Sequence, residues 1–185
     1  FNACEKLDLA PEDYYASGSF WKTPSQVDGA MVGLHNQLRN YQFTLFTLGE
    51  LRGGTLRTGT SFTGSSSLNS SSIISQDIRE SATGISSWAG VNAAIFQVNN
   101  FIYQVEKADY LVAVDKSYYL GQAYGLRAFY YFQLYRTYGR IPLAKEPKVA
   151  ISTPATAADA YLPRTITEKE TLDFIKEDIE KSVTN

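Results

Sequence analysis

The residues of this chain that could take part in catalysis or metal binding are few and far apart. It has one cysteine, Cys4, and one histidine, His35, so it cannot supply a cysteine-based zinc cluster or a histidine-rich metal site. A serine cluster at 65–72 has no nucleophile-elbow sequence around it, and the nearby acids Glu50 and Asp77 have no spacing that pairs them for acid–base work. We therefore expect a protein without enzymatic activity, metal or cofactor.

Charge and hydropathy exclude two further classes of partner. The 185 residues include 17 basic and 19 acidic side chains, so there is no basic excess for nucleic acid or for an anionic membrane surface. No run of about 18 apolar residues is present, so the sequence predicts no bilayer-spanning helix. A chain of this length buries roughly 70% of the surface that its unfolded form exposes, which is enough for a core without disulfides.

Apolar residues at helical spacing predict four helices, over residues 24–48, 86–107, 116–138 and 167–182. A capping-box sequence, Thr23-Pro24-Ser25-Gln26, precedes the first of them. The inner stripe of the last helix is expected to comprise Leu172, Ile175, Ile179 and Val183. Its polar side, expected in solvent, comprises Glu177, Asp178, Glu180 and Lys181. No stretch alternates for long as a strand would, so the predicted fold class is all-α, built from helical hairpins.

A long polar segment separates the first two predicted helices. Sixteen of the 23 residues from 53 to 75 are glycine, serine or threonine, with no apolar period. Such a composition also suits a flexible linker between domains. We favour a long loop within one domain, because apolar residues at helical spacing resume after it as clearly as before it.

The third predicted helix concentrates aromatic rings. Seven tyrosines and phenylalanines lie between Tyr124 and Tyr138, within or beside the stretch LRAFYYFQLYRTYGRIPL (126–143). They could form a ligand platform, a membrane segment or a core. Because the rings surround the helix and two arginines interrupt them, we interpret it as the central helix of a helical stack. Arg127 is then buried and needs a carboxylate or several carbonyl groups as partners.

Small residues and a stop signal complete this helix. Gly121, Gly125 and Ala128 recur at helical spacing and would let a neighbouring helix approach closely. Gly139 is in position to cap the C-terminus, and Pro142 prevents the helix from resuming.

Together these residues resemble a known family. The stretch 126–143 is similar to the signature helix of the SusD/RagB family, and its signature residues here are Arg127, Tyr131, Gly139 and Pro142. Three further segments resemble family segments in the same order: FWKTPSQVDGAMVGLHNQL (20–38), WAGVNAAIFQVNNFIYQVEKA (88–108) and LPRTITEKETLDFIKEDIEKSV (162–183). In them, Asn99 or Asn100 stands in the place of the family's asparagine, and Asp178-Ile179 in the place of its Asp-Leu pair.

The resemblance implies a SusD-like N-terminal region of tetratricopeptide-like helical hairpins, truncated relative to a longer family. The sequence FNACEK (1–6) resembles the end of a lipoprotein signal peptide, which implies acylation of Cys4 and a lipid anchor at the surface of the outer membrane. The alternative is a plain free cysteine. We expect residues 1–22 to form the tether and lead-in, and residues 23–185 to form the helical domain.

The function implied by the resemblance is glycan capture. The protein would bind an oligosaccharide and deliver it to a SusC-like TonB-dependent transporter, with membrane contact only through the lipid anchor. Sugar binding uses flat rings and planar polar groups, and the candidates are Arg52, Arg57 and Trp88. The competing interpretations are solvated loop arginines and a core position for Trp88. The alternative function is a helical-repeat protein interaction module without glycan binding of its own.

Overall fold

The computed structural model describes residues 20–53, 88–147 and 167–185, and every regular element in these ranges is a helix. The chain forms α1 (Pro24–Phe46), the π-helical turn η1 (Thr47–Leu51), α4 (Ala89–Lys107), α5 (Ala113–Tyr138) and α6 (Glu168–Thr184). The all-α prediction is therefore confirmed, and the predicted helices are close to the observed bounds. The predicted polar loop lies, from residue 54 onward, outside the described residues.

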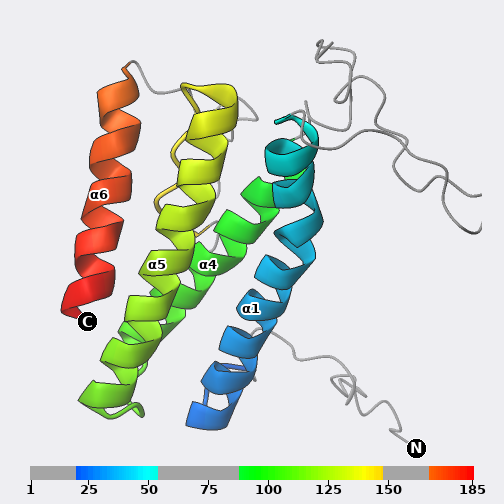
Figure 1. Cartoon of the computed structure of the whole chain (residues 1–185). Coiled ribbons are helices and arrows are strands. Elements are labelled where there is room, and N and C mark those ends of the chain that lie inside the picture. Colours follow the sequence, from blue (N-terminus) through cyan, green and yellow to red (C-terminus); the bar gives the residue numbers. More distant parts are fainter. Residues whose placement is uncertain (1–19, 54–87, 148–166) are drawn as a thin grey trace, which may run out of the picture.

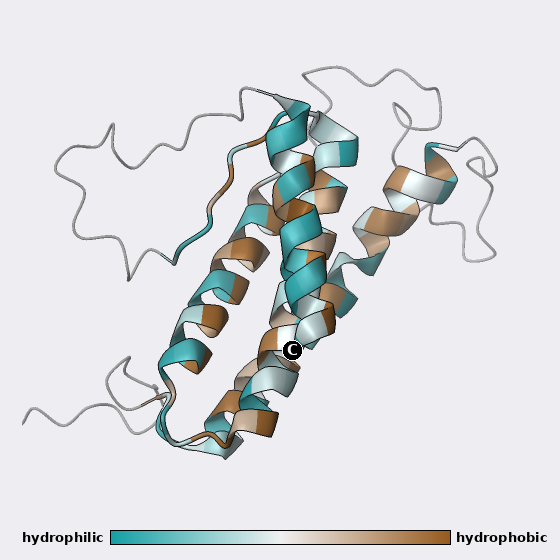
Figure 2. Cartoon of the chain, turned by 90° about the vertical axis from the view of Figure 1, so that its left-hand side faces the viewer, coloured by the Kyte–Doolittle hydropathy of each residue, from teal (hydrophilic) through white to brown (hydrophobic). Residues whose placement is uncertain are grey.

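The helix α5 lies at the centre of the arrangement (Figure 1). It runs antiparallel to α4 in one hairpin and antiparallel to α6 on its other side, and α1 lies along the α4–α5 pair. In Figure 2 the helices carry hydrophobic residues on one side and hydrophilic residues on another. Each helix therefore buries apolar residues against a neighbour, as in tetratricopeptide-like hairpins.

The first helix begins where its sequence predicts. The Thr23 hydroxyl accepts a hydrogen bond from the Gln26 backbone nitrogen, and the Gln26 side chain accepts one in return from the Thr23 backbone nitrogen, at 3.4 and 3.2 Å. This reciprocal box satisfies N–H groups that the first turn of a helix leaves without partners. From this first turn onward, α1 buries Val27, Met31 and Leu34 in the core.

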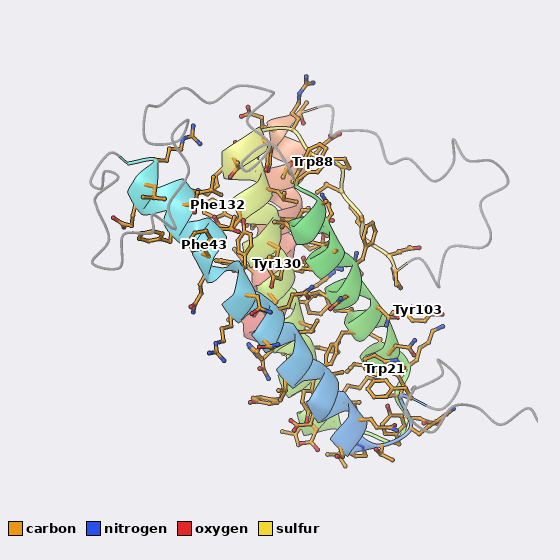
Figure 3. The ribbon with its side chains drawn as sticks, turned by 90° about the vertical axis from the view of Figure 1, so that its right-hand side faces the viewer. Trp21, Phe43, Trp88, Tyr103, Tyr130 and Phe132 are labelled. Atoms are coloured by element: carbon orange, nitrogen blue, oxygen red, sulfur yellow. The ribbon has the colours of Figure 1, made fainter. Side chains whose placement is uncertain are left out.

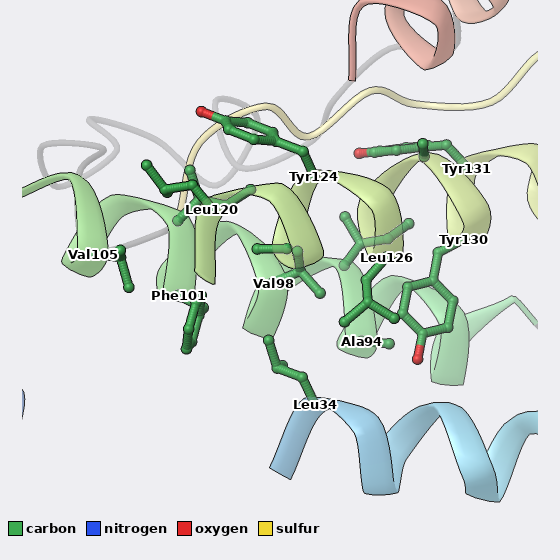
Figure 4. Packing of buried hydrophobic residues seen from close by; sticks show 14 of the residues in the cluster. Leu34, Ala94, Val98, Phe101, Val105, Leu120, Tyr124, Leu126, Tyr130 and Tyr131 are labelled. Atoms are coloured by element: carbon green, nitrogen blue, oxygen red, sulfur yellow. The ribbon is translucent and has the colours of Figure 1, made fainter. Parts of the chain in front are cut away.

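The core lies between α1, α4 and α5 (Figure 4). Val98 and Phe101 of α4 meet Leu34 of α1, and Tyr130 of α5 points toward α1, where its ring lies 5.9 Å from that of Tyr41. Burial, with a smaller contribution from Tyr41, raises the pKa of Tyr130 to about 12. The aromatic run of α5 therefore forms part of a core, as the sequence predicts.

Helices α5 and α6 approach each other closely at two glycines. A Cβ atom on Gly121 would lie 3.2 Å from the backbone oxygen of Ser182, and one on Gly125 would lie 3.0 Å from the Ser182 hydroxyl oxygen. That hydroxyl donates a 2.7 Å hydrogen bond to the Gly121 carbonyl oxygen. The expected role of these small residues is confirmed, because larger side chains would push α6 outward.

The rotation of α6 differs from the prediction. Leu172, Ile179 and Val183 are exposed, at 42%, 51% and 80%. The buried residues are Thr171, Phe174, Ile175 and Asp178. The observed rotation buries the Phe174 ring, worth roughly 1.5–3 kcal/mol, in place of these aliphatic side chains, and it avoids the cost of about 3–5 kcal/mol for a buried guanidinium without its carboxylate. The helix is therefore turned so that Asp178 meets Arg127, and the predicted solvent position of Asp178 is wrong.

Candidate functional site

Three helices meet at one buried arginine. Arg127 of α5 is 5% exposed, and its Nε and Nη2 atoms donate to the two carboxylate oxygens of Asp178 of α6, both at 2.7 Å. Its Nη1 atom donates to Oδ1 of Asn99 of α4 at 2.8 Å and to the carbonyl oxygen of Lys145 at 3.2 Å. The guanidinium group thus has both the carboxylate and the carbonyl partners that a buried charge requires. We call Arg127, Asp178 and Asn99 the arginine centre.

The arginine centre also binds the segment that follows α5 through hydrogen bonds. Residues 141–147, which we call the strap, run back along the bundle without helical structure. Asn99 donates from Nδ2 to the carbonyl oxygen of Ala144 at 2.7 Å. The Tyr131 hydroxyl oxygen lies 2.8 Å from both the carbonyl oxygen and the backbone nitrogen of Ala144, so it donates to one and accepts from the other. Buried side chains therefore supply hydrogen bonds to the backbone of this non-helical segment.

The strap begins at a backbone turn that needs glycine. Gly139 caps α5 with φ 71°, and its backbone nitrogen donates to the carbonyl oxygen of Tyr135 at 2.8 Å. Residues with a side chain rarely adopt backbone angles in this left-handed region. Glycine therefore reverses the chain here with the least backbone strain. Pro142 follows within the strap, where the helix has already ended.

Aromatic rings surround the arginine centre. The guanidinium carbon of Arg127 lies 5.3 Å from the Tyr124 ring and 5.1 Å from the Phe174 ring. Burial raises the pKa of Tyr124, and the hydrogen bond that its hydroxyl donates to Glu106 at 2.7 Å raises it further. Burial likewise raises the pKa of Tyr131. Both hydroxyl groups therefore hold their protons at neutral pH and are available there as hydrogen-bond donors.

A hollow of about 280 Å³ lies between the strap and α6. It is lined by Leu143, Lys145, Glu170, Asp173, Phe174 and Glu177. The Lys145 ammonium lies 5.0 Å from the centre of the Phe174 ring and covers it. The hydrogen bond and charge of Lys181 lower the pKa of the Glu177 carboxyl. The hollow is therefore lined by solvated charges, with its one ring already covered.

Two of the predicted glycan contacts lie among the described residues. Arg52 caps η1 and is exposed, at the end of the bundle where α1 ends and α4 begins. Arg57 and the predicted lipid attachment residue, Cys4, lie outside the described residues. The structure thus places Arg52 on the surface.

Trp88 lies half-buried at the N-terminus of α4 (Figure 3). Its ring makes an edge-on contact with Tyr138 of α5, with 5.4 Å between the ring centres. Its carbonyl oxygen accepts hydrogen bonds from the backbone nitrogen and from Nδ2 of Asn92, at 3.0 and 3.1 Å. With Val91 and Ile95 buried on the same helix, Trp88 occupies the rim of the core.

Two members of the arginine centre could not be found from spacing alone. Asp178 lies among charged residues of α6, and Asn99 is next to a second asparagine. The only signal for them was the family resemblance, which pointed to Asp178 and to either Asn99 or Asn100. The structure selects Asn99, which is 1% exposed.

The three described ranges contain no group of three or more His, Cys, Asp or Glu residues that could hold a metal ion. No helix in these ranges is long and apolar enough to cross a membrane.

Antiparallel helical hairpins around a buried Arg–Asp–Asn centre define an all-α, tetratricopeptide-like protein. Over residues 8–184 the sequence matches the SusD-like family that is described as starch-binding and associating with the outer membrane, and the chain belongs to this family. It is 29% identical over 186 residues to SusD-like protein P38 of Formosa agariphila, an alignment that covers 100% of this chain and 34% of that protein.

Solved structures of related proteins have the same fold. A SusD superfamily protein from Bacteroides fragilis is 38% identical, with a TM-score of 0.74 over 89% of this chain and 31% of the other. NanU of B. fragilis is 32% identical, with a TM-score of 0.74 over 95% of this chain and 33% of the other. The chain thus spans about a third of the length of these relatives.

Proposed function

We propose that this chain belongs to an outer-membrane lipoprotein that captures an oligosaccharide and delivers it to a SusC-like TonB-dependent transporter. The observation that carries the proposal is the match over residues 8–184 to a family described as starch-binding and associating with the outer membrane. Capture requires only recognition, so no bond of the glycan is made or broken. Residues 1–22 would form the tether and lead-in, and residues 23–185 the helical domain.

In this proposal the arginine centre acts as scaffold. It joins α4, α5, α6 and the strap through hydrogen bonds of 2.7–3.2 Å around one guanidinium group. A binding surface carried by such a scaffold is ordered before the ligand arrives, so less conformational entropy is lost on binding.

The glycan contacts proposed for this part of the protein are Arg52, Arg57 and Trp88. Calorimetric titration with maltooligosaccharides, the sugars of starch, is the first test. Laminarin is a second probe, because a laminarin-binding SusD-like protein has the same fold. The two sequences are 17% identical, so the likeness is one of fold only. A charged hydrogen bond is worth about 1.5–3 kcal/mol, so we expect Arg52→Ala or Arg57→Ala to weaken binding roughly tenfold or more.

A matched control for these variants is available on α1. Arg39→Ala removes an exposed arginine from the helix itself, and we expect it to leave the affinity unchanged. If Arg52→Ala and Arg57→Ala also leave the affinity unchanged, the assignment of these contacts is refuted, whereas the capture function would still stand on the titration of the unmodified chain.

The lipid anchor is tested separately. Mass spectrometry of the protein extracted from membranes is expected to find acyl groups on Cys4, and Cys4→Ser is expected to release the protein into the soluble fraction. A Cys4 thiol without acyl groups in membrane-extracted protein would refute the anchor.

A second candidate function is docking to the transporter without glycan binding by this part. The observation that favours it is the direction of the rings: Tyr124, Tyr130 and Tyr131 of α5 are all buried, and Trp88 is packed on Tyr138. Capture of the purified transporter by the immobilised chain, together with no heat on addition of either glycan, would favour docking alone.

A further inference from the structure

Trp21 combines a large side chain with a left-handed backbone conformation. Its φ is 67°, and the other positive φ among the described residues is that of Gly139. Residues with a side chain rarely adopt this region, and a bulky residue in it is strained. Such strain persists only where the surrounding contacts hold the residue in place. The contacts of Trp21 therefore identify what fixes the chain at this position.

The Trp21 ring packs against other rings beside α4 (Figure 3). It is partly buried, and its centre lies 4.9 Å from that of Phe20 and 5.8 Å from that of Phe101, in edge-on contacts. Phe101 of α4 is 1% exposed, and its ring centre lies 6.3 Å from that of Tyr119 of α5. A row of rings thus joins the residues before α1 to two helices that follow much later in the chain.

The hydrogen bonds that begin α1 start immediately after Trp21. The backbone nitrogens of Lys22 and Thr23 both donate to Oε1 of Gln26, at 2.7 and 3.2 Å, and the Thr23 hydroxyl accepts from the Gln26 backbone nitrogen. This capping box lies within residues 22–26, so it forms without the Trp21 ring. Separation of the ring from α4 would therefore leave α1 capped, and it would relieve the left-handed backbone of Trp21.

We propose that Trp21 is a latch, which closes onto Phe101 and opens while the helices remain folded. When the latch is closed, the chain enters the bundle fixed to α4. When it is open, the entering chain is joined to the bundle through the start of α1. Burial of the ring favours the closed state, whereas relief of backbone strain and the freedom of the released residues favour the open state. The latch is separate from the arginine centre and from the proposed glycan contacts, and it does not depend on acylation of Cys4.

The latch is tested with Trp21 as its own reporter. The chain has two tryptophans, so Trp88→Phe leaves Trp21 as the only one and keeps a ring against Tyr138. Urea is added to this 185-residue chain, and tryptophan emission and far-ultraviolet circular dichroism are measured on the same samples. We expect the emission to shift to longer wavelength at urea concentrations below those at which helix is lost. Coincident transitions would overturn the proposal, because the ring would then leave α4 only when helices unfold.

A second variant acts on the backbone and leaves the core residues unchanged. Lys22 is exposed, and Lys22→Pro pushes the residue before it toward an extended conformation with negative φ. In the Trp88→Phe chain without urea, this change should open the latch. The emission should shift to longer wavelength, and quenching by acrylamide should rise toward that of the unfolded chain, with circular dichroism unchanged. The matched control is Lys22→Ala, which keeps the backbone N–H that proline removes and should change neither emission nor quenching.

An emission that Lys22→Pro leaves unchanged would overturn the proposal, because the left-handed backbone would then not be needed to hold the ring on α4. A change as large in Lys22→Ala as in Lys22→Pro would overturn it as well, since the loss of the lysine side chain would explain both. If Lys22→Pro loses helix, the urea transitions of the Trp88→Phe chain decide alone. Glycan titration and acylation of Cys4 are measured separately, and neither result bears on the latch.

Discussion

Asp178→Asn provides the sharpest test of the arginine centre. The substitution keeps the shape of the side chain and removes its charge, so the Arg127 guanidinium loses its counter-ion while it remains buried. The two side chains are 6% and 0% exposed, and two hydrogen bonds of 2.7 Å join them. Removing one partner of such a pair costs about 3–5 kcal/mol. Domains of ordinary stability have about 5–15 kcal/mol in total, so a large share would be lost.

Urea unfolding followed by circular dichroism measures this loss directly. The matched control is Asp173→Asn, which breaks the Lys169–Asp173 pair on the outside of the same helix, where the side chains are 79% and 59% exposed. Such exposed pairs are worth about 0.3–0.5 kcal/mol. If the loss for Asp178→Asn is as small as that for Asp173→Asn, the arginine centre does not hold the helices together and the reasoning is refuted.

The double variant Arg127→Met/Asp178→Leu separates charge from packing. It removes both charges, so it should recover part of the stability lost in Asp178→Asn. Recovery should be incomplete, because Asn99 and the Lys145 carbonyl oxygen lose their Arg127 donor. A double variant as stable as the original chain would show that these two hydrogen bonds contribute nothing.

Three further changes test other parts of the fold by the same unfolding measurement. Burial raises the pKa of Tyr130 to about 12, so this tyrosine ionises first in the unfolded chain as the pH rises above 10. It should contribute a loss of up to about 1.4 kcal/mol per pH unit between pH 10 and 12, on top of the loss from the other buried tyrosines. Tyr130→Phe should reduce the slope by about that amount, and an unchanged slope would contradict the assignment. Gly121→Val should destabilise by about 1–3 kcal/mol because α6 backbone atoms lie too close, whereas Gly33→Ala, with open space around its Cβ, should stabilise by about 0.5–1 kcal/mol; equal effects would refute the close approach. Thr167→Ala removes the cap of α6 and should cost about 1 kcal/mol, and no loss would mean that the observed capping box does not stabilise the helix.

The existence of the helices could be predicted from the sequence because local signals define them. The Thr23 capping box, the apolar period of α4 and the glycine after Tyr138 each act within a few residues of the boundary that they set. A close approach of some neighbouring helix to α5 could be predicted for the same reason, since Gly121 and Gly125 lie one turn apart on one helix, but only the structure shows that this neighbour is α6.

The rotation of α6 could not be predicted because it depends on a partner 51 residues away. Periodicity favoured burial of Leu172 and Ile179, but the observed rotation buries Phe174 instead and also gives Arg127 its carboxylate. Similarly, the strap has no periodic pattern, and its position follows from hydrogen bonds to Asn99 and Tyr131 that only the assembled helices create.

A shared guanidinium group also determines how the bundle can open. If α6 separates from α5, Arg127 loses the carboxylate of Asp178 and is left as an unpaired charge between the remaining helices. If the strap separates, Asn99 and Tyr131 lose their hydrogen-bond partners at Ala144. Partial detachment of either piece therefore costs a large share of the total stability. We expect α4, α5 and α6 to exchange their amide hydrogens as one cooperative unit, while α1, which contributes no group to the centre, opens separately and more often.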